Sequence, residues 1–150
     1  MNNSDSRMQA VHLLSLPDAH GALLTDFVFY PALDLLHMRW HGHLTAEAVV
    51  RGAKAGMELF AGRAFPARLL TNHLAVTGEW SEALPWLQYD WLPAAHARGV
   101  RRVAHVLAHS TASQLINYHG GPEFIHAITY MLRAQSFRHE APAWQWLTRP

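Results

Sequence analysis

Two short apolar runs enclose a tryptophan-rich segment in the middle of the chain. The runs cover residues 67–74 and 100–108, and continuous apolar runs of this length are typical of strands covered on both faces. Between the two runs, apolar residues recur at steps of three or four, on one side of a helix: Trp80, Leu84, Leu87, Trp91 and Ala94 or Ala95. The pattern predicts a strand, a helix and a second, parallel strand joined by a right-handed crossover.

Two residues of this predicted helix suit its ends, and one proline lies inside it. Ser81 can cap the start and Gly99 can end the helix. Pro93 is interior, where a proline costs roughly 3 kcal/mol unless the helix deforms. We therefore expect a bend over residues 89–93.

The residues before the crossover predict an antiparallel hairpin. Residues 22–30 and 35–41 are rich in strand-forming side chains and flank a turn at residues 31–34. In the second run Leu36, Met38 and Trp40 alternate with the polar residues His37, Arg39 and His41. This period of two predicts a half-buried strand with one face on the core.

The remaining segments predict a helix after the hairpin and alternating elements after the crossover. Thr45 can cap a helix over residues 46–61, with Glu47 in its first turn. The later segments suggest a helix at 110–118, a break at 120–122, further helix at 123–129, a strand at 130–137 and a closing helix at 140–147. Helix propensity competes with the strand assignment at 130–137.

The whole chain therefore predicts a single α/β domain over residues 21–150, with a mixed, mostly parallel sheet of about five strands. Residues 1–20 are expected to form a partly flexible N-terminal extension. Within it, residues 11–16 suit either an extra edge strand or a packed arm.

Composition narrows the range of functions. Half of the 150 residues are hydrophobic, 15% are charged and the net charge is +1, which argues against nucleic acid as a partner. No apolar run approaches the roughly 18 residues needed for a membrane span, and residues 1–7 show no signal peptide. The absence of cysteine excludes disulfides and thiol chemistry. We expect a cytoplasmic protein.

Histidine is unusually frequent, with twelve residues. His37, His41 and His43 share one face of the second hairpin strand, where imidazoles can ligate zinc or copper, and Asp26 on the partner strand could complete such a site. The alternative is that these side chains face solvent on an open side of the sheet.

A second candidate site lies around the predicted strand end at Asn72 and His73. Ligand sites in open α/β sheets lie beyond the carboxyl ends of parallel strands. With Trp80, Trp86 and Trp91, these residues could line a pocket for a small apolar or lipid-like ligand. The alternative is that Trp80 and Trp91 are core residues of the helix, while Trp86 lies off the apolar stripe and could mark a partner surface.

Four stretches of the chain carry a resemblance to a known family. They are Tyr30-Pro-Ala-Leu-Asp34 with the run to Gly42, Thr71-Asn72, Trp86 to Pro93 leading to Gly99-Val-Arg-Arg-Val-Ala104, and Phe137 followed by Glu140-Ala-Pro-Ala-Trp144. Over residues 22–148 the chain resembles the SpoIIAA-like, or STAS/SEC14-type, small bacterial domains. The resemblance implies a STAS-like fold and a ligand-binding or signalling role.

The resemblance does not extend to the phosphoswitch members of that family. They carry Asp-Ser-Ser-Gly after the third strand, whereas residues 72–80 of this chain lack a serine pair. No catalytic motif is present, since no serine lies in a Gly-x-Ser-x-Gly turn. We expect a non-enzymatic module without a cofactor that recognises a protein partner or a small apolar ligand. Hydrophobic content and open sheet edges favour a homodimer, and a small enzyme at Asn72 and His73 is the least favoured alternative.

Overall fold

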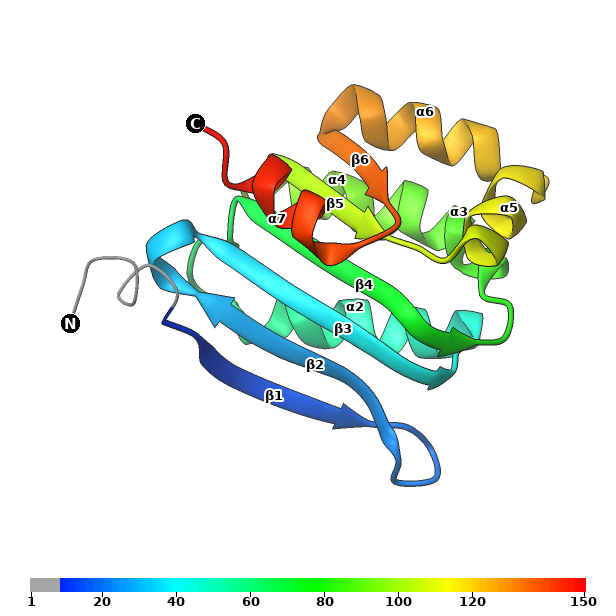
Figure 1. The fold of residues 1–150 in the computed structure, drawn as a ribbon, viewed down its shortest axis with the longest axis horizontal. Coiled ribbons are helices and arrows are strands. Elements are labelled where there is room, and N and C mark those ends of the chain that lie inside the picture. Colours follow the sequence, from blue (N-terminus) through cyan, green and yellow to red (C-terminus); the bar gives the residue numbers. More distant parts are fainter. Residues whose placement is uncertain (1–8) are drawn as a thin grey trace.

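A computed structural model describes residues 9–150, which form an α/β domain around one mixed sheet of six strands (Figure 1). The strands lie in chain order across the sheet: β1 Val11–Pro17, β2 Leu23–Tyr30, β3 Leu35–His43, β4 Arg68–Thr77, β5 Arg102–Val106 and β6 Arg133–Phe137. The pairings β1–β2 and β2–β3 are antiparallel, and the three from β3 to β6 are parallel.

The helical elements follow the same order along the chain. They are η1 Pro31–Leu33, α2 Ala46–Leu59, η2 Ser81–Ala83, α3 Leu84–Trp86, η3 Leu87–Trp91, α4 Leu92–Ala97, α5 His109–Asn117, α6 Gly121–Met131 and α7 Glu140–Leu147. No helix within residues 9–150 is both long enough and apolar enough to cross a membrane.

The predicted hairpin is confirmed as β2 and β3, but the sheet has six strands rather than five. The additional strand is β1, so the edge-strand interpretation of residues 11–16 is correct and the packed-arm alternative is wrong. Leu13, Leu14 and Leu16 pack partly against the main core. This apolar contact, together with the backbone pairing to β2, holds the segment on the sheet. Residues 1–8 of the predicted N-terminal extension lie outside the described residues.

Helices cover the two faces of the sheet unequally (Figure 1). The larger core lies on one face, where the side chains of α2, α3, α4, α5 and α6 meet the sheet. The smaller core lies on the opposite face, where Ala143 and Leu147 of α7 pack against Leu70 and Ala104. The alternation predicted for β3 follows this division, since Leu36, Met38 and Trp40 belong to the larger core.

Helix α2 begins where its sequence predicts and ends slightly early. The Thr45 side chain accepts a hydrogen bond from the backbone N–H of Ala48, and Glu47 lies in the first turn. The helix ends at Leu59, two residues earlier than predicted, and Gly62 follows with a φ of +79°. Glycine tolerates this left-handed backbone without a steric penalty.

The tryptophan-rich crossover is helical but irregular. Its α-helical hydrogen bonding is interrupted by the π-helical turn η3, where the Leu92 N–H donates to the Leu87 carbonyl immediately before Pro93. A wider turn accommodates the proline, which has no N–H to donate. The predicted cap at Ser81 is wrong, because Ser81 instead opens the turn η2 and its buried hydroxyl makes no capping hydrogen bond.

The last strand is shorter than the sequence suggests. Residues 130 and 131, predicted as strand, form the last residues of α6, and β6 begins at Arg133. Ile128 and Leu132 are buried at this end of the helix, whereas Tyr130 is 86% exposed. Residues 130 and 131 are therefore helical, as their helix propensity favours, and the packing of Ile128 against the core holds this end of α6 in place.

Candidate functional site

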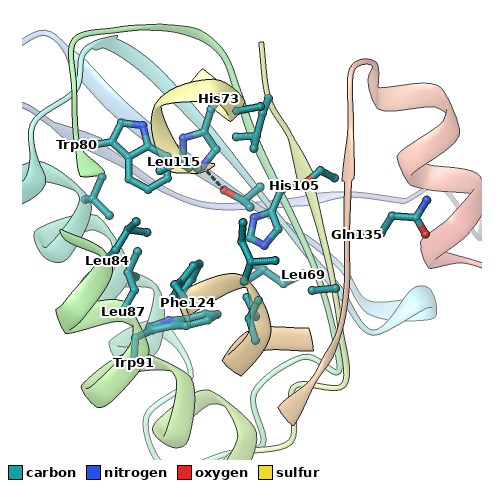
Figure 2. Close-up of a pocket in the computed structure, with 18 of the residues that line it drawn as sticks. Leu69, His73, Trp80, Leu84, Leu87, Trp91, His105, Leu115, Phe124 and Gln135 are labelled. Carbon is teal, nitrogen blue, oxygen red and sulfur yellow. Dashed lines mark hydrogen bonds between the residues drawn. The ribbon is translucent and has the colours of Figure 1, made fainter. Parts of the chain in front are cut away.

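A cavity of about 530 Å³ lies between the sheet and the helices on the larger-core side (Figure 2). Strands β4, β5 and β6 form its floor, the crossover helices form one wall, and α5 and α6 cover it. Helix α6 spans the space between β6 and the crossover, since it contacts β6, α3, η3 and α4. The cavity is therefore lined by segments from both halves of the chain, since Trp40 of β3 and Ala53 of α2 also line it.

The cavity floor carries one row of polar side chains across three parallel strands. Thr71 of β4 is in register with His105 of β5, which is in register with Ser136 of β6. All three residues line the cavity. His105 and Ser136 are the penultimate residues of their strands, whereas Thr71 is the fourth of the ten residues of β4. On β5 and β6 the row therefore lies towards the carboxyl ends, where ligand sites of open α/β sheets occur.

The walls of the cavity are apolar. Leu84, Leu87 and Trp91 project from the crossover helices, and Leu115 of α5 and Phe124 of α6 face them (Figure 2). Such a lining holds apolar molecules by removing their surface from water.

One end of the cavity is built by three stacked rings. The His73 imidazole lies between two indoles, with ring centroids 5.6 Å from Trp40 and 5.0 Å from Trp80 and interplanar angles of 13° and 18°. Gly52 of α2 makes room for the outer ring, since a Cβ at this position would lie 2.3 Å from the Trp40 side chain. The stack forms a flat, rigid aromatic wall.

A hydrogen-bonded chain runs through the same residues. The Trp40 Nε1–H donates to Thr71 Oγ1 at 3.0 Å, and Thr71 Oγ1 lies 3.0 Å from His73 Nε2. Because indole can only donate, the threonine hydroxyl is free to donate to the imidazole. The opposite ring nitrogen of His73, Nδ1, is buried without a partner among residues 9–150.

Both cavity histidines are neutral at ordinary pH. Burial, with a smaller contribution from the nearby His105, lowers the pKa of His73 to about 3. Burial alone lowers the pKa of His105 to about 4. His105 nevertheless keeps part of its surface exposed, and its ring points into the cavity (Figure 2). A neutral imidazole offers one donor and one acceptor.

The structure brings together three of the five predicted site residues. His73, Trp80 and Trp91 line the cavity, as the sequence suggests, although Trp80 and Trp91 also pack in the larger core. Asn72 is on the opposite face of the sheet, because neighbouring strand residues point to opposite sides. Trp86 does not line the cavity, and its ring lies 5.9 Å from the Lys54 ammonium of α2.

Asn72 instead holds helix α7 against the sheet. Its Nδ2 donates to Glu140 Oε2 at 2.7 Å, and Trp144 Nε1 donates to Glu140 Oε1 at 3.1 Å. His37 Nε2 lies 3.1 Å from the same carboxylate, without the alignment of a hydrogen bond. Burial lowers the pKa of His37 despite the neighbouring carboxylate. This cluster is a structural clasp at the N-terminus of α7.

The three hairpin histidines do not converge. His37 contacts Glu140, whereas His41 Nε2 lies 3.3 Å from Asp26 Oδ2. His43 lies beside Gly78, close to where a Cβ of that residue would stand. Across residues 9–150 no group of three or more His, Asp or Glu side chains is placed to hold a metal ion.

Asp26 forms a small polar cluster on the open face of the hairpin. Partial burial would raise its pKa, but the Ser15 hydroxyl, His41 and Arg39 together hold the pKa below the usual value. The cluster agrees with the alternative of an open, polar sheet face at His41, but that alternative is wrong for His37, which is 7% exposed and lies against Glu140 of α7.

The sequence did not single out several residues that build the cavity. Thr71 and His105 were visible as polar residues inside apolar strand runs, which is a signal of a buried polar site. Leu115 and Phe124 gave no such signal, because an apolar residue on a short amphipathic helix is usually core.

Comparison with known proteins supplies no family for this chain. No protein-family model matches it, and no curated protein matches it.

Proposed function

We propose that this protein is a non-enzymatic binding module, with the STAS-like character that its sequence resembles, and that it holds a small apolar ligand in the cavity beneath α5 and α6. The observation that carries the proposal is the cavity itself: about 530 Å³, apolar walls and a single polar row on its floor. Cavities that bind small molecules span roughly 300–1,000 Å³ and combine apolar walls with few polar groups.

The location of the cavity supports the same proposal. It lies towards the carboxyl ends of the parallel strands β5 and β6, and its walls come from the crossover helices, α5 and α6. The neutral state of His73 and His105 suits an apolar occupant, because no buried charge would have to be desolvated against it.

Native mass spectrometry of the untagged protein tests whether a ligand is carried from the cell. We expect a mass excess of a few hundred daltons at most, which disappears when the protein is denatured. The second measurement is fluorescence titration with N-phenyl-1-naphthylamine, an apolar probe whose emission rises in a dry site. We expect saturable binding of one probe per chain.

A cavity-filling variant assigns the probe to this site. Ala112 of α5 lines the cavity, so Ala112→Trp places an indole in the space that the probe needs. We expect at least ten-fold weaker binding for this variant. Ala97→Trp adds the same side chain at an exposed position of α4 and should bind as the wild type does. Equal binding by a folded Ala112→Trp protein would refute the proposed site.

A further inference from the structure

The ring of His105 carries hydrogen-bonding groups that no other side chain among residues 9–150 uses, and it lines the cavity. His105 lies in the middle of the floor, and burial is what lowers the pKa of its ring. His73 is less accessible to a ligand, because its ring is stacked on two tryptophans, its Nε2 lies beside the Thr71 hydroxyl and its Nδ1 is buried. His105 is only half-buried and faces the cavity, so a ligand can supply the hydrogen-bond partner that the protein does not.

The surroundings of His105 define what could pair with it. Leu69, Leu115 and Phe124 stand around its ring, so a partner group reaching it must belong to an otherwise apolar molecule (Figure 2). Gln135 precedes Ser136 on β6, but its amide points away from the cavity (Figure 2). The remaining strongly polar lining residue is Arg138, which is exposed at the rim and donates to His109 Nδ1 at 2.9 Å.

We propose that His105 is the specificity-determining residue of the cavity, and that the ligand class is an uncharged apolar molecule carrying one hydroxyl or carbonyl group that hydrogen-bonds to the His105 imidazole. This inference rests on the proposed function, since it names the chemistry of the same site. The imidazole can serve either group, because its N–H donates to a carbonyl and its other nitrogen accepts from a hydroxyl. A carboxylate is disfavoured, because its charge would be buried among apolar walls without a cation beside His105.

Three naphthalene probes of similar size distinguish a neutral polar ligand, a purely apolar ligand and an anion. The first is 1-naphthol, which is neutral at pH 7.5 and carries a hydroxyl; the second, 1-methylnaphthalene, has no polar group; the third, 1-naphthoate, is an anion. Affinities are measured by equilibrium dialysis against wild-type protein. We expect 1-naphthol to bind about five-fold more tightly than 1-methylnaphthalene, the usual net effect of one hydrogen bond, and 1-naphthoate to bind most weakly.

Variants test whether His105 causes the difference. His105→Leu should remove the preference for 1-naphthol while 1-methylnaphthalene binds within about two-fold of wild type. His126→Leu makes the same change at an exposed position of α6 outside the cavity and should keep the preference. The ¹⁵N shifts of the His105 ring in wild-type protein give a second measurement that does not depend on how the variant folds, and they should move with 1-naphthol alone.

Each of the other possible results would refute a different part of the proposal. Equal binding of 1-naphthol and 1-methylnaphthalene, or a preference that survives in His105→Leu, would refute the role of His105 and leave the apolar cavity as a binding site. Tightest binding of 1-naphthoate, lost in Arg138→Gln, would replace the neutral ligand by an anion held at the rim. Failure of all three probes to bind wild-type protein would refute the proposed function itself.

Discussion

At the scale of single residues, the unusual feature is a pair of neutral histidines inside the protein. His73 is stacked between two tryptophans and His105 faces an apolar cavity, and among residues 9–150 neither ring has a carboxylate partner to stabilise its charged form. Desolvation therefore dominates and the pKa of each ring falls. The same isolation that keeps His105 neutral leaves its ring nitrogens free for a ligand.

These lowered pKa values predict a loss of stability in acid. Between pH 6.5 and about 4, the unfolded chain binds a proton at each of His73 and His105 that the folded protein does not bind. The free energy of unfolding should therefore fall as the pH falls through this window, by about 1.4 kcal/mol per pH unit for each histidine. Urea unfolding at half-unit steps from pH 7.5 to 4.5 measures the slope.

The His105→Leu variant identifies the contribution of one ring. It retains His73 and His37, whose pKa burial also lowers, so the remaining slope should be shallower than that of the wild type by about 1.4 kcal/mol per pH unit. Parallel curves for the two proteins would contradict the assignment of a neutral, buried His105.

At the scale of elements, the tight turn between α5 and α6 sets how these helices cover the cavity. Gly121 opens α6 so close to the end of α5 that a Cβ there would lie 1.7 Å from the Leu115 carbonyl oxygen. A backbone oxygen cannot move aside without shifting the helix. Leu115 and Phe124, which flank this turn, both line the cavity. Glycine at position 121 therefore allows α5 and α6 to approach closely where they cover the cavity.

The two neighbouring glycines provide a matched test of this turn. Gly121→Ala should destabilise the protein by about 1–3 kcal/mol, the usual cost of overpacking, and should weaken probe binding because α5 or α6 must move. Gly120→Ala should leave both unchanged, since its backbone has a φ of −110° and its Cβ would come no closer than 4.0 Å to another atom. Thermal unfolding and the N-phenyl-1-naphthylamine titration measure the effects; equal behaviour of the two variants would contradict the argument.

At the scale of the whole molecule, the sheet separates the cavity on one face from the α7 clasp on the other. One face carries the cavity, while the other carries α7, attached through Glu140 to Asn72 of β4 and to Trp144 of α7 itself. The helix buries Ala143 and Leu147 against the same strands that form the cavity floor on their other side. The smaller core therefore stabilises the strands of the cavity floor, while the side chains of α7 do not line the cavity.

Removing the clasp should therefore affect stability and leave ligand binding unchanged. Glu140→Ala leaves the Asn72 amide and the Trp144 indole without their acceptor, so we expect a loss of about 1–3 kcal/mol in the free energy of unfolding. Under native conditions, the N-phenyl-1-naphthylamine affinity should stay within two-fold of wild type. Glu58→Ala removes an exposed carboxylate of α2 and serves as the control. A strong loss of probe affinity in a folded Glu140→Ala protein would show that the two faces are coupled.

The sequence alone determines local features of the fold, such as the alternation along a strand and the start of a helix. The alternation from Leu36 to His41 predicts both the strand and the side that faces the core, since strand side chains point to opposite faces in turn. Thr45 predicts the start of α2 because its hydroxyl can reach the free backbone N–H groups there. Such signals depend on atoms a few residues apart.

The site is decided by the tertiary structure. Thr71, His105 and Ser136 form one row only because three strands far apart in the chain pair in a particular register. Asn72 and His73 are adjacent in sequence, yet the sheet places them on opposite faces, one beneath α7 and one in the cavity. The sequence specifies which residues alternate. Strand register and helix placement, which depend on contacts between distant segments, specify which of those residues meet.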